Sequence, residues 1–172
     1  DALYGIATAD IGLPGLIVRH READGEHYVY VVDPVRHCLA GYTVFNRLIE
    51  VGRRADPHLR APHSKYATAY QRRSIARAVY EWVLDGGLGH RFCLLSGARQ
   101  SPAAHALWQA LGRRHPLGYV EVRDKTLRYL GPQVSEPILA DLHTRLLLLA
   151  PGWTIAGLAA RTGMTLGDAP DP

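Results

Sequence analysis

Two helix patterns and one strand pattern alternate in the middle of the chain. Apolar residues recur from Ile75 to Val83 at the spacing of one helical face, and the glycines of 85–89 then end the helix. The short apolar run 91–96 predicts a buried strand. A second helix is expected from Pro102, because Ser101 suits the N-cap and proline suits the first helical position.

Strand patterns flank this unit on both sides. Residues 27–32 and 38–49 predict an antiparallel hairpin, with Gly41 as a possible bulge, and Leu16–Val18 suggests an earlier strand. Residues 119–122, 127–130 and 142–149 predict further strands. Residues 50–62 are polar and broken by Gly and Pro, so a loop is expected, and 63–69 is a weak strand candidate.

This order of elements predicts a mixed α/β fold with a mostly antiparallel sheet. A strand–helix–strand unit of this length normally makes its two strands parallel, through a right-handed crossover. We expect residues 1–150 to form one domain and residues 151–172 to form a C-terminal tail with a short helix.

Charge and composition give only a weak indication of which ligand or partner the protein binds. The net charge of +4, from 20 basic and 16 acidic residues, suits an anionic ligand or partner. No Cys or His spacing matches a metal site, and both Cys38 and Cys93 are expected to be buried. No leader pattern and no apolar run of about 18 residues is present, so neither a signal peptide nor a membrane span is expected and a cytoplasmic location is predicted.

The stretch from Tyr66 into the first helix has the composition of an anion site. Helix N-terminal N–H groups are unpaired and the helix dipole favours negative charge. Small side chains at Ser74 and Ala76 allow close backbone approach, and Arg72 or Arg73 adds positive charge.

Two segments resemble the GNAT superfamily of acyl-CoA-dependent N-acyltransferases. Gln71–Ala76 matches the Q/R-x-x-G-x-G/A pyrophosphate loop, with Ser74 in place of the first glycine. Ser101–Trp108 matches the spacing of Asn-x-x-Ala-x-x-x-Tyr, with Ser101 for Asn and Trp108 for Tyr. The resemblance spans about His27 to Leu149. The sequence around Gln-Ser-Pro also resembles that of phage and prophage members of the superfamily.

The resemblance implies a GNAT-like fold that binds acetyl-CoA or another acyl-CoA. The strand ending near Tyr66 would splay from the strand at 92–96, and pantetheine would lie in the resulting cleft. The cofactor-binding residues implied are Tyr66, Ala67, Thr68, Gln71, Arg72, Arg73, Ser74, Ile75, Ala76, Ser101, Ala104 and Trp108. Trp108 stands where a tyrosine often protonates the thiolate, so His105 or Tyr70 is the candidate acid or base. Trp108 is also compatible with a role in the core, because it lies on an apolar helix face.

Two functions remain open from the sequence. The first is an N-acetyltransferase acting on an amine of a small molecule, a protein or a charged tRNA, with an acceptor pocket built from about 1–26, 50–62 and 131–141. The alternative is a catalytically degenerate GNAT-like binding module whose basic surface contacts nucleic acid or a protein partner. Nucleic-acid binding would weaken steeply with salt, whereas a pantetheine cleft would be less sensitive.

Overall fold

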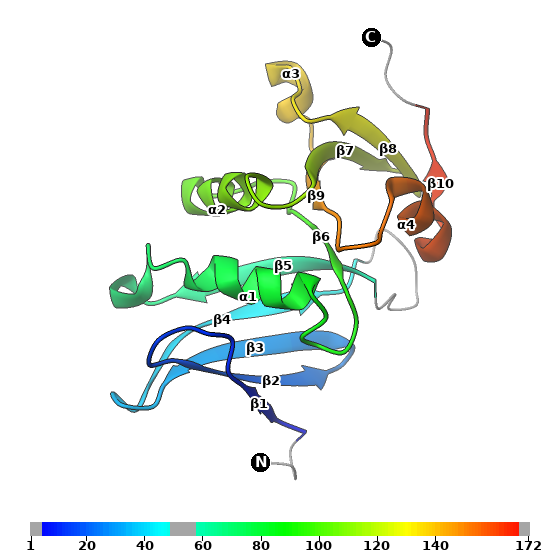
Figure 1. Cartoon of the computed structure of the whole chain (residues 1–172). Helices are drawn as coiled ribbons and strands as arrows, with labels where there is room; N and C mark the ends of the chain where they lie inside the picture. The colour runs from blue at the N-terminus through cyan, green and yellow to red at the C-terminus, as the bar shows by residue number, and fades with distance from the viewer. Residues whose placement is uncertain (1–4, 49–57, 169–172) are drawn as a thin grey trace.

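The structure, a computed structural model, describes residues 5–48 and 58–168. These residues form one continuous ten-stranded sheet with four α-helices (Figure 1). The strands are β1 Ala7–Ala9, β2 Ile17–Ala23, β3 Glu26–Asp33, β4 Cys38–Asn46, β5 Leu59–Tyr66, β6 Cys93–Leu95, β7 Leu117–Arg123, β8 Thr126–Gly131, β9 Thr144–Leu148 and β10 Thr165–Leu166. The helices are α1 Ile75–Leu84, α2 Pro102–Gly112, α3 Glu136–Leu139 and α4 Ile155–Thr162, and η2 Thr68–Tyr70 is a 3-10 turn.

The strand order is β1-β2-β3-β4-β5-β6-β9-β7-β8-β10. Among the strand pairs of the described residues, β5–β6 and β8–β10 are parallel and the others are antiparallel. The expected mixed, mostly antiparallel sheet with a strand–helix–strand–helix unit is therefore confirmed. The N-terminal part is more extensive than the expected hairpin, because β1 to β5 form a five-stranded meander.

The predicted bulge at Gly41 is confirmed. The β3–β4 register shifts between Val31 and Val32, opposite Gly41 and Leu39. A Cβ on Gly41 would lie 2.3 Å from the Tyr66 ring and 2.5 Å from the Lys65 carbonyl oxygen. Glycine at this position therefore lets the end of β5 lie close against β4.

The predictions around β5 need correction. The loop expected over 50–62 is wrong from Leu59 onward, where β5 begins, and residues 50–57 lie outside the described residues. Leu59 and Arg60 are buried, and proline within the run hid a strand with a regular β4 register. The strand predicted over 63–69 ends at Tyr66, because the chain turns into η2.

Other boundaries and burial predictions changed less. The first helix, the second helix with its Ser101 N-cap, and buried Cys93 are confirmed, but Cys38 is exposed because it begins β4 beside a turn. β6 and β9 are shorter than expected. The C-terminal segment holds the expected short helix, and Leu158 of α4 packs into the main core. The division into a domain and a tail stays a prediction.

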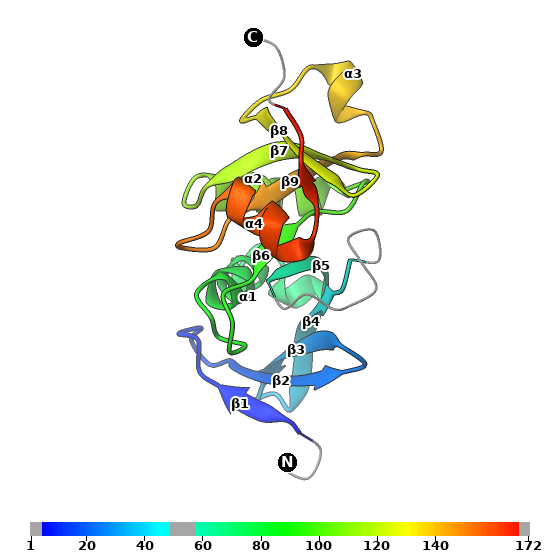
Figure 2. The same ribbon diagram turned by 90° about the vertical axis from the view of Figure 1, so that its right-hand side faces the viewer.

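The helices lie on two different parts of the sheet. α1 runs along β3 to β5, whereas α2, α3 and α4 lie toward the β6–β10 part (Figures 1 and 2). α1 packs on β4 through the edge-on contact of Tyr80 with Phe45, and on α2 through that of Tyr80 with Trp108. No helix among the described residues is long and apolar enough to span a membrane.

Candidate functional site

The parallel strands β5 and β6 separate almost as soon as they meet. They pair only at Leu59 with Cys93 and at Arg60 with Leu94, although β5 continues to Tyr66. The backbone edge of β5 beyond Arg60 is therefore not paired with β6, and this is the place where the resemblance implies a pantetheine cleft.

The pleat of β5 fixes which backbone groups face this cleft. Cys93 N donates to His58 O at 2.8 Å, and Ala67 N donates to Ala40 O at 2.9 Å. Because successive residues of a strand turn their N–H and C=O groups to opposite neighbours, the even-numbered residues Pro62, Ser64 and Tyr66 face the β6 side. Proline is tolerated at 62 because its missing N–H would have pointed to a place where β6 has already departed.

The loop before α1 has a left-handed backbone at two positions. Arg72 has φ +60° and Ser74 has φ +59°, and neither is glycine. Ser74 is the N-cap of α1, yet its side chain makes no capping hydrogen bond. Ala78 N makes the first helical bond to Ser74 O, so the N–H groups of 75–77 have no acceptor within the helix. These N–H donors, with arginines beside them, have the properties of an anion-binding helix start.

The side chains of this loop are partly held in place. Gln71 Nε2 donates to Tyr66 O at 2.9 Å, which ties the loop to the end of β5. The Arg73 guanidinium lies 5.3 Å from the centre of the Tyr70 ring. Gln71, Arg72, Arg73 and Ser74 are exposed, while Ile75 is buried and Ala76 is half-buried. Ala67 and Thr68, also predicted cofactor contacts, are exposed between β5 and the loop.

A hydroxyl network lies beneath the cleft edge. Thr43 Oγ1 is 2.7 Å from Ser64 Oγ and 3.1 Å from the Tyr66 hydroxyl, and Ser64 Oγ is 3.2 Å from the Tyr80 hydroxyl. Burial raises the pKa of Tyr66 to about 12 and raises the pKa of Tyr80 further. Both phenols stay protonated at neutral pH, so this network positions β5 and holds no charge.

The start of α2 is built differently from the start of α1. Ser101 has an extended backbone, and its Oγ accepts from Ala104 N at 3.1 Å. Ala104 is half-buried, whereas Trp108 is only 3% exposed and packs against Tyr80. Trp108 therefore serves the core between α1 and α2, one of the two roles that its sequence position allowed.

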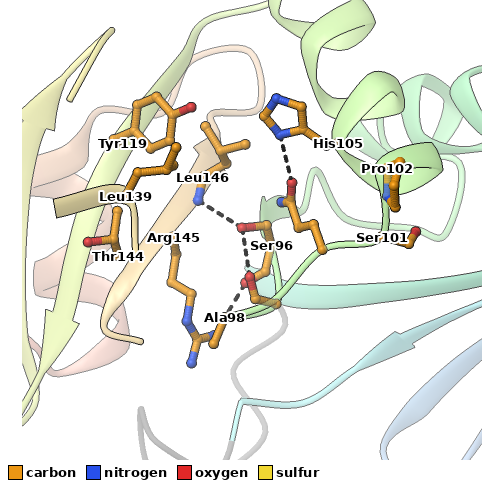
Figure 3. Close-up of a pocket in the computed structure, with 12 residues that line it drawn as sticks. Ser96, Ala98, Ser101, Pro102, His105, Tyr119, Leu139, Thr144, Arg145 and Leu146 are labelled. Carbon is orange, nitrogen blue, oxygen red and sulfur yellow. Dashed lines mark hydrogen bonds between the residues drawn. The ribbon is translucent and has the colours of Figure 1, made fainter. Parts of the chain in front are cut away.

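A cavity of about 320 Å³ opens beyond the end of β6 (Figure 3). The lining comes from the β6–α2 connection, the first turns of α2, and strands β7 and β9; its polar side chains are Ser96, Gln100, Ser101, His105, Tyr119, Thr144 and Arg145. No carboxylate is among the lining residues. The cavity can therefore accommodate a polar ligand beside an imidazole, a phenol and a guanidinium.

Hydrogen bonds fix the floor of this cavity. Ser96 Oγ accepts from Leu146 N at 2.8 Å, and Ser96 N donates to Leu146 O at 2.8 Å. Arg145 Nη1 donates to Ser96 O at 3.2 Å. These bonds extend the β6–β9 pairing and hold the start of the β6–α2 connection rigid.

The structure separates the two predicted acid–base candidates. His105 lines the cavity, and its Nδ1 lies 3.3 Å from Gln100 Oε1. Tyr70 is buried against the β3–β4 turn, where its hydroxyl donates to Asp33 Oδ2 at 2.8 Å and lies 3.3 Å from Cys38 Sγ. Hydrogen bonds to Cys38 and Asp33 raise the pKa of Tyr70. Tyr70 thus anchors the loop before α1 and does not line the cavity.

Sequence reasoning missed several cavity residues. Tyr119 was expected only as part of a strand, and Ser96, Thr144 and Arg145 were not singled out. Their meeting depends on β9 lying between β6 and β7, which no local pattern encodes. Among the described residues, no group of three or more His, Cys, Asp or Glu side chains could hold a metal ion.

Comparison with known proteins gives a distant likeness only. No model of a protein family matches the chain, and no curated protein matches its sequence. Solved structures similar to it include the ribosomal-protein-S5-alanine acetyltransferase from Vibrio fischeri, at 17% identity and a TM-score of 0.42, with 75% of this chain and 64% of that chain covered. A protein described as a GnaT-family acetyltransferase from Bordetella pertussis is similar at 22% identity and a TM-score of 0.42, with coverage of 73% and 66%. The chain spans just under two thirds of the length of each of these proteins.

Proposed function

We propose that the chain is an acyl-CoA-dependent N-acyltransferase of the GNAT superfamily, which transfers acetyl from acetyl-CoA to an amine acceptor. The observation that carries the proposal is the divergence of β5 and β6 after two paired residues, with an uncapped helix start following the free end of β5. A parallel pair that opens this early leaves a strand edge for an extended, amide-containing ligand.

The residues present fit acetyl-CoA at both ends of this cleft. The backbone edge at Pro62, Ser64 and Tyr66 would pair with the two amides of pantetheine, as an added strand does. The N–H groups at the start of α1, with Arg72 beside them, would hold the pyrophosphate. Acetyl-CoA, when bound, supplies an activated thioester.

The cavity beyond β6 is the proposed acceptor site. His105 would take the proton from the attacking amine, because it supplies the imidazole among the side chains that line the cavity. Tyr119 would donate a proton to the leaving thiolate, a step that buried Trp108 cannot perform. The hydroxyl of Ser101 is a candidate donor to the oxyanion, whereas the hydroxyl of Ser96 already donates to Gly97 O.

Calorimetric titration with acetyl-CoA and with CoA tests the cofactor site. We expect saturable binding by the unchanged chain, and a loss of about 100-fold or more in Ser74→Glu, because a carboxylate would face the pyrophosphate. Ser135→Glu is the matched control, since Ser135 is also an N-cap serine without a capping hydrogen bond. Absence of binding at millimolar acetyl-CoA would sink the proposal.

Release of CoA in the presence of a panel of amines tests catalysis separately. We expect His105→Ala to lose about 100-fold or more of the turnover while keeping acetyl-CoA affinity. Tyr70→Phe should keep the turnover at saturating acetyl-CoA, because Tyr70 anchors the loop before α1 and does not line the cavity. Tight acetyl-CoA binding without transfer to any amine would instead favour the degenerate binding module.

The cellular location and the origin of the protein stay predictions. A cytoplasmic location and a phage or prophage origin rest on the sequence alone. Fractionation of the native cells, followed by detection of the chain, tests the first of them.

A further inference from the structure

The sheet surface opposite α1 carries aromatic and basic side chains in two cross-strand rows. The strand registers place Arg19, Tyr30, Tyr42 and Lys65 side by side in one row, and Arg21, Tyr28, Val44 and His63 in the next. We call these eight residues the open face. They come from four adjacent strands, β2 to β5, so the rows cross the sheet from one strand to the next.

The two sides of the same strands differ sharply in burial. Val29, Thr43 and Phe45 on the α1 side are fully buried. Tyr28, Tyr30 and Tyr42 on the other side are half-buried and lie outside the core cluster, while His63 and Lys65 are exposed. In Figures 1 and 2, α1 is the helix along this part of the sheet, and it lies on the buried side. The tyrosines therefore present ring surface that the core does not use.

The charge on the open face has one sign. The two rows contain Arg19, Arg21, Lys65 and His63 and no carboxylate. The acidic residue on the same side of β3 is Glu26, which accepts from Arg47 N at 2.7 Å and pairs with Arg47 Nε at 3.5 Å. The Arg21 guanidinium lies 5.4 Å from the centre of the Tyr28 ring, so cation and aromatic ring already form one surface.

We propose that the open face binds single-stranded nucleic acid. Half-exposed tyrosines on adjacent strands lie about 4.8 Å apart in the hydrogen-bonding direction, and each offers a ring on which a base can stack. The cations Arg19 and Lys65 at the two ends of one row, and Arg21 at one end of the other, suit the phosphates of the same strand. Stacking on rings does not require a particular base, so the expected recognition is tolerant of sequence. This surface is separate from the proposed acyl-CoA cleft and does not depend on acyl transfer.

Fluorescence anisotropy with labelled poly(U) and poly(dT) of about 12 nucleotides tests the proposal. We expect each of Tyr30→Leu and Tyr42→Leu to weaken binding by about 5- to 150-fold, the loss expected for one stacked base. Lys65→Gln should weaken binding and reduce the slope of log affinity against log salt by about 0.7, the value for one lost phosphate contact on a single strand. Arg113→Gln is the matched control, because Arg113 is an exposed cation at the end of α2.

Thermal unfolding and acetyl-CoA titration of every variant distinguish loss of the surface from loss of the fold. Weaker oligonucleotide binding with an unchanged unfolding temperature supports the proposal. No binding by the unchanged chain at about 50 mM salt would overturn it, as would an equal loss in Arg113→Gln. Binding to anionic vesicles alone, or dimerisation that Tyr42→Leu abolishes without any oligonucleotide binding, would also overturn it.

Discussion

The serines at the starts of α1 and α2 behave in opposite ways. Ser101 adopts an extended backbone, caps its own helix through Ala104 N and is followed by proline. Ser74 adopts a left-handed backbone, makes no capping bond, and is followed by N–H groups without an acceptor in the helix. In α2 the N-cap side chain accepts a hydrogen bond from one N–H group of the first turn, whereas in α1 the N-cap side chain accepts none. A strained, uncapped start costs stability, which is the usual condition of a binding site.

The largest expected difference is between two glycines: Gly41 of β4, which lies against the end of β5, and Gly97 in the connection between β6 and α2. Gly41→Ala should cost about 2 kcal/mol, because its Cβ would meet the Tyr66 ring and the Lys65 carbonyl oxygen at the end of β5. Gly97→Ala, ahead of α2, should cost less than about 0.5 kcal/mol, since its Cβ meets only Arg99 O at 3.4 Å. Urea unfolding of both variants measures the difference, and equal costs would contradict this packing.

The capping contrast predicts the next effect. Ser101→Ala should cost about 1 kcal/mol of unfolding free energy, because it removes the acceptor for Ala104 N. Ser74→Ala should show no such loss, since no capping bond exists to remove. Denaturant unfolding of the two single variants and of the double variant checks this, and a larger cost at Ser74 would refute the contrast.

At their other ends, the two helices are joined by a pH-sensitive contact. Glu81 of α1 receives hydrogen bonds from His115 at 2.8 Å and from Arg114 at 3.0 Å. Burial raises the pKa of Glu81, but the bonds from His115 and Arg114 outweigh it and hold the pKa below the ordinary 4.5. A depressed carboxylate pKa gives stability that is present above the unfolded value and is lost as the pH falls through the folded value.

Glu81→Gln should therefore lower the unfolding free energy by about 0.5–1 kcal/mol at neutral pH, and by less below about pH 4. Urea midpoints across this range measure the change. Glu136→Gln, an exposed residue on α3, is the control, and parallel pH curves for wild type and Glu81→Gln would refute the link.

The smallest expected effect is a gain. Ser74→Gly should raise the unfolding free energy by about 0.5 kcal/mol, because glycine adopts a positive φ without the clash of a Cβ, although it loses more entropy on folding. Acetyl-CoA affinity should be unchanged, since the donors belong to the backbone. Thermal unfolding measures the gain, and a clear loss of stability would show that Ser74 has an unrecognised structural contact.

Local chemistry made α1, α2, α4 and most strands predictable, whereas α3 lies within 131–141, where no helix was expected. The apolar spacing from Ile75 and the Ser101-Pro102 start are signals contained within the first two or three turns of a helix. The conformation of Ser74 was not predictable in the same way, because serine normally avoids a positive φ and the surrounding fold imposes it. Tyr70 became an anchor through Asp33, a partner 37 residues away.

The candidate site was less predictable than the fold. Its cofactor half follows from a helix start and the strand before it, which are continuous in sequence. The cavity proposed for the acceptor is lined by Ser96, His105, Tyr119 and Arg145. These residues meet only through the pairing of β9 with β6 and β7. Periodicity identifies the strands but not this order.

The position of β9 has a consequence for how the molecule assembles. Leu148 pairs with Leu94 and with Leu117, so β9 fills a gap between strands made much earlier in the chain. Strands β2 to β4 close through short turns and can form quickly, whereas β9 must pair with β7 and β6 across about 20 and about 50 residues of chain and should be slow. During synthesis, the part of the sheet that borders the proposed cofactor site would thus fold before the proposed acceptor cavity is complete. β6 would carry an unpaired edge until residue 148 has left the ribosome.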